Sequence, residues 1–457
     1  MERIMSLEEK LIAYSESDYY GFHMPGHKRN LALFEKENRI PYEIDITEID
    51  GFDDLHHSED ILLDARKKAA QVFGAEESYY LINGSTVGNI AAIMSVTNKG
   101  DKILIARNNH KSVYNAVFLQ ELQPIYVYPE FNSEYNINGE ILATDVEKIL
   151  DDENDTKAVV IVSPTYEGVI SDIQEIANIV HGKGIPLIVD EAHGAHLGME
   201  EYFHRNSNVM GADIVVHSVH KTLPSLTQTG LLHVNGSLVD SEKVQRYLRM
   251  LQSSSPSYIL MASIDKCVKM MDDKGKELFH CYVKHLKKLR SSLQTMKKLK
   301  IVETEVYDRS KIVISTKNTN LSGKELYRIL LEQYHLQMEM SAIDYVIAMT
   351  SVGDTEVGLE RLEKALLEID KNIEENIENN QQYHKDNIQE TVIEQENQQI
   401  RELPHLKHAE NGEMGSEWFY YMYPPGIPLV VPGEVITEEI KSLMKHYEQQ
   451  GFMIYKS

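Results

Sequence analysis

Short apolar runs recur through the first half of the chain, and helix-like segments such as 110–121, 143–150 and 172–182 separate most of them. The runs are apolar almost throughout instead of alternating with polar residues, which is typical of strands covered on both faces. This pattern predicts an α/β domain with a mostly parallel sheet between two layers of helices. The predicted strands cover residues 79–82, 102–106, 125–128, 158–162, 186–190, 213–217 and 230–234.

Two further helices are predicted ahead of this region. Residues 6–17 form a short helical pattern, which ends before the glycines and the proline of "GFHMPGHKRN". Residues 58–73 have helical spacing, and we expect Ser58 to be the N-cap because acidic residues follow it in the first turn.

The pattern changes after about residue 258. A long helical stretch over roughly 258–296 precedes a strand-like "KIVIST" and a helix-like "SGKELYRILLEQY", which together predict a smaller α+β domain. Residues 367–402 are dominated by Glu, Asn, Gln and Lys, a composition typical of a poorly packed surface segment. We therefore expect an N-terminal arm over 1–50, a large domain over 51–295, and a small C-terminal domain over 296–457 that contains the polar insertion.

Composition narrows the class of protein. The 457 residues carry a formal net charge of −25, which argues against general affinity for nucleic acid or an anionic membrane. The chain has only two cysteines, Cys267 and Cys281, so a disulfide framework is excluded and a reducing compartment is favoured. The N-terminus is acidic where a signal peptide needs an apolar core, and no apolar run is long enough to span a bilayer. These features predict a cytoplasmic protein.

Candidate chemistry gathers where the predicted strands end, which is the edge where ligands bind in parallel sheets. Gly84, Ser85 and Thr86 stand between a strand and a helix. Free N–H groups and hydroxyls at a helix start make a cradle for one phosphate, although the same residues also fit an ordinary capped turn.

The segment "IPLIVDEAHGAH" (185–196) has several interpretations. A strand that ends in Asp-Glu-Ala-His resembles a helicase Walker B element, but the phosphate loop that a helicase requires is missing, so we reject that function. His193 and His196 lack further residues at ligand spacing, so we expect no metal. Asp190 remains as a buried carboxylate that needs a cationic partner to stay ionised.

Two more residues follow neighbouring strand ends. His110 stands at the entrance to a helix, where a single histidine is usually a capping or packing residue. Lys221 follows the strand at 213–217, close to Ser218 and His220. A lysine in a partly desolvated pocket has a lowered pKa and can form an imine. A phosphate cradle, a carboxylate, a histidine and a lysine together match the needs of pyridoxal 5'-phosphate.

The chain resembles the Orn/Lys/Arg decarboxylase family, whose members have the aspartate-aminotransferase-like fold (fold type I) and use pyridoxal phosphate. It is similar to the short form found in Gram-positive bacteria and their arginine decarboxylases. The motifs that carry the resemblance are "HMPGHKR" (23–29), "GFDDLHH" (51–57), "NGSTVGN" (83–89), "ARNNHKS" (106–112), "VDEAHGAH" (189–196), "HSVHKTLPSLTQ" (217–228), "QSSSPSYILMAS" (252–263) and "YPPGIPLVVPGE" (423–434).

The resemblance implies a role for each matching residue. Lys221 would hold the cofactor covalently, Asp190 would pair with the pyridine nitrogen, and His110 would stack on the ring. His193 would lie near the other edge of the ring, and either Lys221 or His220 would return a proton to the product. The phosphate would be bound by Gly84, Ser85, Thr86, Ser218 and His220.

For the distal cation of the substrate, Glu434 is the first candidate, and Asp53 and Asp54 are weaker ones. A carboxylate after Pro-Gly is also commonly just a helix cap.

The implied function is decarboxylation of a basic amino acid, with arginine to agmatine for polyamine synthesis favoured and lysine or ornithine as alternatives. Aminotransfer and a non-catalytic binding or regulatory protein of the same fold also remain open. Fold-type-I sites are normally completed by a neighbouring subunit, so we expect a homodimer or a larger assembly.

Overall fold

The computed structural model describes residues 16–23, 26, 28, 30–33, 46–49, 52–375, 415–423 and 426–457. The helix predicted over 6–17 falls almost entirely outside these residues, as does the polar segment after residue 375. None of the helices in the described ranges combines the length and the apolarity needed to cross a membrane.

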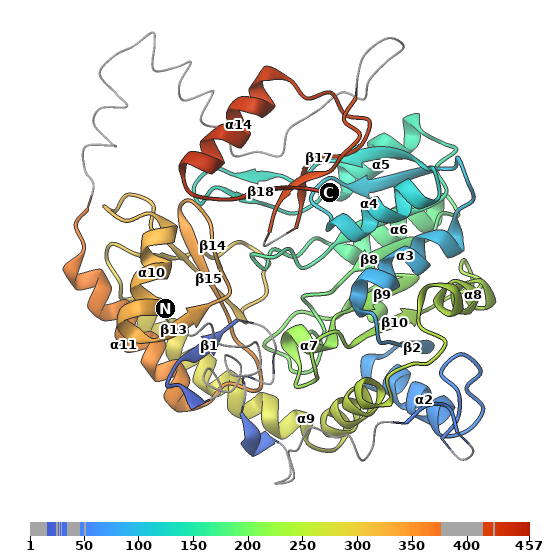
Figure 1. The fold of residues 1–457 in the computed structure, drawn as a ribbon, viewed down its shortest axis with the longest axis horizontal. Coiled ribbons are helices and arrows are strands. Elements are labelled where there is room, and N and C mark those ends of the chain that lie inside the picture. Colours follow the sequence, from blue (N-terminus) through green and yellow to red (C-terminus); the bar gives the residue numbers. More distant parts are fainter. Residues whose placement is uncertain are drawn as a thin grey trace, which may run out of the picture.

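A seven-stranded sheet forms the centre of the large domain, in the order β2-β10-β9-β8-β7-β3-β4 (Figure 1). β10 is antiparallel to both of its neighbours, and the other strands all run in one direction. Their carboxyl ends therefore meet at one edge, as the sequence pattern predicts. The strands are β2 (Glu77–Leu81), β3 (Lys102–Ala106), β4 (Gln123–Val127), β7 (Val159–Val162), β8 (Leu187–Asp190), β9 (Ile214–His217) and β10 (Gly230–Val234).

Helices cover both faces of this sheet because successive side chains of a strand point to opposite faces. Ile103 and Ile105 of β3 pack with α3, α4 and α8, whereas Leu104 between them packs with α5 and α6. The helices are α3 (Gly84–Val96), α4 (Lys111–Leu119), α5 (Ala143–Asp152), α6 (Ile173–Gly182) and α8 (Ser241–Leu251), with short turns α7 (Val219–Thr222) and η3 (Ser207–Met210) and a small hairpin of β5 (Phe131–Asn132) and β6 (Ile137–Asn138).

The helix predicted from residue 58 begins later than expected. α2 (Ile61–Phe73) has Asp60 at its N-cap position, and Ser58 does not cap it. The Ser58 hydroxyl donates instead to the carbonyls of Asp54 and Leu55. The carboxylate of Asp53 accepts from the backbone N–H groups at 59, 60 and 62, and therefore does the capping that was predicted for Ser58.

A second layer of structure follows the long helix α9 (Tyr258–Leu293). A four-stranded sheet in the order β11-β12-β15-β14 packs with α10 and α11, and the N-terminal strand β1 pairs in parallel with β13. The elements are β1 (Tyr20–Phe22), η1 (Leu31–Leu33), β11 (Lys300–Ile301), β12 (Lys311–Ser315), α10 (Gly323–Tyr334), β13 (Leu336–Met338), β14 (Met340–Ser341), β15 (Tyr345–Met349) and α11 (Glu356–Asn372).

The start of the predicted polar insertion belongs to α11. Asp370 is buried in this helix and accepts the backbone N–H groups of Lys297, Lys298 and Leu299, just beyond the end of α9. The segment over 367–372 is therefore packed helix, in contrast to the exposed segment that its composition predicts.

The C-terminal residues form a separate three-stranded sheet in the order β17-β16-β18, with one helix (Figure 1). It contacts α4, where Lys111 Nζ donates to the Tyr421 hydroxyl at 3.1 Å, and α10, where Lys324 Nζ donates to the Gly451 carbonyl at 2.8 Å. Its elements are β16 (Tyr420–Met422), β17 (Pro428–Val430), α14 (Glu438–Gln449) and β18 (Ile454–Lys456).

Gly88 allows α3 to approach the sheet closely, which leaves no space for a larger side chain at this position. A Cβ atom at Gly88 would lie 2.6 Å from Leu81 Cδ1 and 2.8 Å from Val216 Cγ1. Gly88→Val should therefore destabilise the protein by about 1–3 kcal/mol through overpacking, measured as a lower midpoint of thermal unfolding. Gly182→Val is the control because nothing lies within 4 Å of that position. Equal midpoints for the two variants would contradict this account of the packing.

Candidate active site

A cavity of about 340 Å³ opens at the carboxyl edge of the central sheet, where the predicted site residues converge. Loops from the large domain, the β5–β6 hairpin and the C-terminal segment contribute to its wall. The lining residues are Ser85, Asn108, His110, Asn138, Val162, Thr165, Tyr166, Glu167, Asp190, Ala192, His193, His220, Lys221, Thr227, Tyr423 and Ile427.

Lys221 reaches this cavity from α7, the single turn that follows β9. Its Nζ lies 3.0 Å from Nε2 of His193. Burial lowers the pKa of the Lys221 ammonium, although the charge of Asp190 acts in the opposite direction. The environment therefore favours the neutral amine, which is the nucleophilic form.

Asp190 is the last residue of β8 and is 3% exposed. Its carboxylate accepts from Asn89 Nδ2 at 2.7 Å and from the backbone N–H of Ala192 at 3.1 Å. Burial raises the pKa of the Asp190 carboxyl, while Lys221 and the Asn89 hydrogen bond oppose that rise. A cation in contact with this carboxylate would stabilise its ionised form.

His110 is the N-cap of α4 as well as part of the cavity wall. Its Nδ1 accepts from the backbone N–H of Ser112 at 3.2 Å and lies 2.9 Å from the Ser112 hydroxyl. Burial, with help from the charges of Lys221 and Lys111, lowers the pKa of His110 to about 3, so the ring is neutral near pH 7. A Cβ atom on Gly426 would lie 3.2 Å from two atoms of this ring, so the C-terminal segment packs against it.

Asn89 connects the two residues just described. One Asn89 Nδ2 group donates both to Asp190 and, at 2.9 Å, to the Ser112 hydroxyl that contacts His110. The ring of His110 and the carboxylate of Asp190 are therefore oriented by a single amide. Sequence reasoning missed Asn89, although it stands four residues after Ser85 and hence on the same face of α3.

The predicted phosphate cradle lies at the start of α3 and at the end of β9. The Ser218 hydroxyl donates to the Ser85 hydroxyl at 2.7 Å, and both flank the exposed first turn that carries Gly84 and Thr86. His220 Nδ1 donates to the Thr229 carbonyl at 2.8 Å, which fixes the hydrogen on Nδ1 because a carbonyl only accepts. Of the cradle residues, Ser85 and His220 line the cavity, whereas Gly84, Thr86 and Ser218 do not.

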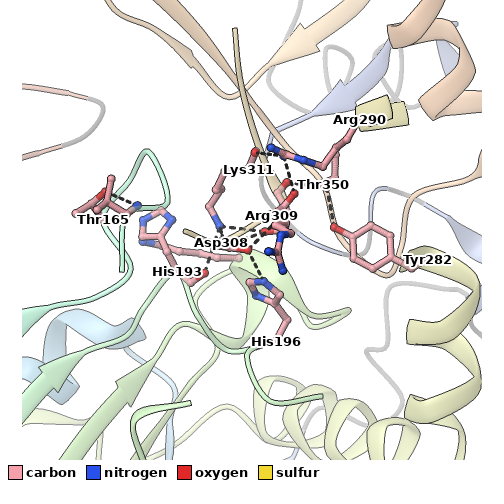
Figure 2. Close-up of polar contacts among 12 residues, drawn as sticks. Thr165, His193, His196, Tyr282, Arg290, Asp308, Arg309, Lys311 and Thr350 are labelled. Carbon is pink, nitrogen blue, oxygen red and sulfur yellow. Dashed lines mark hydrogen bonds and ion pairs between the residues drawn. The ribbon is translucent and has the colours of Figure 1, made fainter. Parts of the chain in front are cut away.

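The two histidines of the "DEAHGAH" segment contact different groups (Figure 2). His193 faces Lys221 and packs against the Tyr166 ring, with 4.5 Å between ring centroids. His196 turns away, and its Nε2 lies 2.9 Å from Asp308 Oδ1. No group of three or more His, Cys, Asp or Glu side chains suited to a metal ion occurs among the described residues.

Asp308 and Lys311 form a fully buried ion pair behind His193 (Figure 2). Lys311 Nζ donates to Asp308 Oδ2 at 2.7 Å and to the His193 carbonyl at 3.3 Å. The charges of His196 and Lys311 hold the pKa of the Asp308 carboxyl far below its usual range, even though burial acts in the opposite direction. This pair joins the start of β12 to the loop that follows β8.

The three carboxylates predicted to meet the substrate do not reach the cavity of their own subunit. Glu434 is fully buried, where Oε2 lies 3.2 Å from Arg107 and accepts the backbone N–H of Val431 at 2.8 Å. Asp53 caps α2, and Asp54 lies 3.0 Å from the ring of His57. Each of these carboxylates already serves local structure.

Pyridoxal phosphate fits the residues that are present. Hydroxyls and a histidine at one end suit a phosphate, and Lys221 and Asp190 suit the aldehyde and the ring nitrogen. Two buried atoms of the wall, Asn108 Oδ1 and His193 Nδ1, have no hydrogen-bond partner within the described structure. Polar atoms of this kind are expected to face a ligand.

Comparison with solved structures defines the class of fold. The chain is similar to lysine decarboxylase A from Pseudomonas aeruginosa with a TM-score of 0.73 and 18% identity, over 98% of this chain and 79% of that one. The molecule thus has the fold of the fold-type-I pyridoxal-phosphate enzymes.

Comparison of sequences defines the family. The model of the Orn/Lys/Arg decarboxylase major domain matches residues 6–342, and the chain belongs to this family of amino-acid decarboxylases. It is 30% identical to an arginine decarboxylase of Halalkalibacterium halodurans over 97% of this chain and 93% of that protein. It is 32% identical to one of Bacillus subtilis, over 92% of this chain and 88% of that protein.

Sequence reasoning also gave no role to several further residues of the cavity wall, among them Tyr166, Glu167 and Thr227. The first two follow the strand β7, whose carboxyl end lies on the edge that was expected to bind a ligand. A polar residue after that strand end was therefore an available signal, whereas Thr227 lies within the motif over 217–228, which was quoted without a role for this residue.

The buried Asp308–Lys311 pair generates a prediction about stability. Asp308→Asn should lower the free energy of unfolding by about 3–5 kcal/mol at pH 7, because it leaves the Lys311 charge buried without its partner. The pKa of Asp308 is lowered by folding, so the contribution of its ionised form is complete above the unfolded value of about 4 and is lost as the pH falls further.

The measurement is thermal unfolding of wild type and variant at pH 7 and at several values below pH 4. The difference between the two midpoints should shrink on acidification. Asp273→Asn, which removes an exposed carboxylate of α9, is the control for the change in net charge. A difference that stays constant with pH would contradict the ionised pair.

Proposed function

We propose that this protein decarboxylates arginine to agmatine with pyridoxal phosphate, in the cytoplasm and for polyamine synthesis. The observation that carries the proposal is the convergence of the Lys221 amine and the Asp190 carboxylate on one cavity in a member of this family. Arginine is favoured because several relatives aligned over most of both chains, including the two compared above, are named arginine decarboxylases.

When bound, pyridoxal phosphate supplies an electron sink that accepts the electron pair left on the substrate as carbon dioxide departs. Asp190 keeps the ring nitrogen protonated, and burial strengthens this interaction because water does not screen it. Asn89 holds the carboxylate in place for that contact. The ring of His110, which is neutral near pH 7, would contact the cofactor ring without adding a positive charge beside it.

Lys221 would hold pyridoxal phosphate covalently through its amine. Nε2 of His193 lies 3.0 Å from the Lys221 amine and would orient it. Lys221 and His220 are the two residues of the wall that would donate the proton needed by the product carbon. Ser85, Thr86, Ser218 and the backbone at Gly84 bind the phosphate, with His220 beside them.

Product analysis tests this function directly. Purified protein supplied with pyridoxal phosphate is incubated separately with arginine, lysine and ornithine, and the product is identified by mass spectrometry. We expect agmatine from arginine. Cadaverine or putrescine as the main product would change the substrate, a keto acid would mean aminotransfer, and no product together with no absorbance change on adding borohydride would contradict an enzyme.

Lys221→Ala should abolish both the borohydride-sensitive absorbance and the amine product, because no other lysine lines the cavity in the described structure. Lys284→Ala, an exposed position of α9, is the matched control and should keep both. Amine formation by the Lys221 variant at the wild-type rate would refute the assignment of this residue.

We also propose that the protein is a homodimer or a larger assembly. The apolar residues Phe118 and Leu119 of α4 are 65% and 56% exposed, on the helix that His110 caps. Exposed apolar pairs of this kind are common at protein interfaces. Light scattering after size-exclusion chromatography should give at least twice the mass of one chain, and an active monomer would contradict the proposal.

A further inference from the structure

A basic amino acid has a second positive group, at the far end of its side chain, which a decarboxylase must bind without reacting with it. In a partly desolvated cavity, such a cation needs a carboxylate within hydrogen-bond distance. None of the three carboxylates predicted from the sequence lines the cavity of its own subunit. A carboxylate that does line the wall is therefore better placed to meet the distal cation.

Two carboxylates line the cavity in the described part of the chain, Asp190 and Glu167. Asp190 is 3% exposed, bonded to Asn89 and Ala192, and assigned to the ring nitrogen in the proposed function. Glu167 is half-buried and stands on the turn that follows β7. With the cofactor beside Asp190, Glu167 is the acidic side chain of the wall that remains for the substrate.

The turn that carries Glu167 is fixed by hydrogen bonds. Thr165 N–H donates to the Val169 carbonyl at 2.9 Å, and Gly168 N–H donates to the Thr165 carbonyl at 3.0 Å. The Asp308 N–H donates to the Gly168 carbonyl at 2.7 Å, which attaches the turn to the buried cluster behind His193 (Figure 2). Glu167 is thus held on a rigid element, as a specific binding group requires.

The small domain supplies the group that orients the Glu167 carboxylate. The hydroxyl of Tyr345, on the buried strand β15, donates to Glu167 Oε1 at 2.8 Å. Burial and the charge of Glu167 raise the pKa of Tyr345 well above its usual value, so the phenol stays protonated and remains a donor. Beside it, the Tyr166 hydroxyl donates to Glu339, which adds a second negative charge behind the wall.

We propose that Glu167, oriented by Tyr345, binds the distal cation of the basic amino acid and so determines the preference of this site for a cationic side chain. The inference rests on the proposed function, since it concerns the substrate of the same cavity. It locates the specificity at the junction of the two domains, where a loop of the large domain meets β15 of the small one.

Arginine and its neutral isostere citrulline provide the test, because they differ mainly in the charge at the far end. The holoenzyme of wild type and of Glu167→Gln is titrated with each, and agmatine formation gives kcat and KM for arginine. We expect wild type to bind arginine at least about 10-fold more tightly than citrulline, and Glu167→Gln to raise the arginine KM about 10- to 100-fold with a smaller change in kcat.

The ratio of the two affinities separates binding of the cation from a purely structural role. In Glu167→Gln, the preference for arginine over citrulline should fall to about 3-fold or less, whereas structural damage would weaken both ligands in parallel. Glu77→Gln is the matched control. Glu77 also accepts from a tyrosine hydroxyl, but it lies at the amino end of β2, whereas the cavity opens at the carboxyl edge of the sheet. Glu167→Asp, which keeps the charge, should retain a clear preference for arginine.

The possible failures are distinguishable. If wild type forms no amine from arginine, lysine or ornithine, the proposed function fails and this inference fails with it. If wild type forms the amine but Glu167→Gln keeps the wild-type preference for arginine over citrulline, only the inference is overturned. If Glu167→Gln does not fold, the arginine KM of Glu167→Asp tests the inference instead. A shortened side chain cannot keep both the Tyr345 contact and the contact with the cation, so an unchanged KM would overturn the inference.

Discussion

The hydrogen bond from Asn89 to Asp190 is the contact on which the rest of the site depends. A carboxylate buried at the end of a strand is stable only if its oxygens are bonded, and one oxygen accepts from Asn89 at 2.7 Å. The same amide reaches Ser112, which contacts His110. Asn89 can do this because Gly88 lets α3 lie directly on the sheet. The close packing of one helix thus sets the positions of two side chains that come from other elements.

The second structural requirement is a firm junction between the domains. The Asp308–Lys311 pair is buried, and Lys311 also donates to the carbonyl of His193. A buried ion pair is a poor source of net stability, but it is highly directional, since misplacing either partner leaves a charge unsatisfied. The loop that carries His193 and the turn that carries Glu167 are both attached to this pair. The Asp308–Lys311 pair therefore fixes the loop and the turn relative to each other, and both belong to the wall of the cavity.

Much of this architecture could be predicted because the residues responsible carry local signals. All seven strands of the central sheet are apolar runs, Lys221 and His110 follow strand ends, and Asp190 is the last residue of β8. The residues that were missed act across the fold. Asn89 is significant only through its distance to Asp190, and Glu167 only through the cavity that it faces. Conversely, Asp53 and Glu434 look like free carboxylates in the sequence, whereas tertiary contacts use them for a helix cap and for Arg107. Composition also misjudged residues 367–372, because the burial of Asp370 in α11 depends on the backbone at 297–299.

His110 illustrates how strongly such a fold restricts substitution. The residue must accept a backbone N–H at the start of α4 and also present a flat, uncharged ring to the cavity. Serine, threonine, aspartate and asparagine cap helices but have no ring, and phenylalanine or tryptophan has a ring but no acceptor in reach of the helix. Imidazole is the natural side chain that combines both properties at this length. Selection for activity from a library of variants at position 110 should therefore recover histidine. Another residue would be accepted there only after a different residue had taken over the capping of α4.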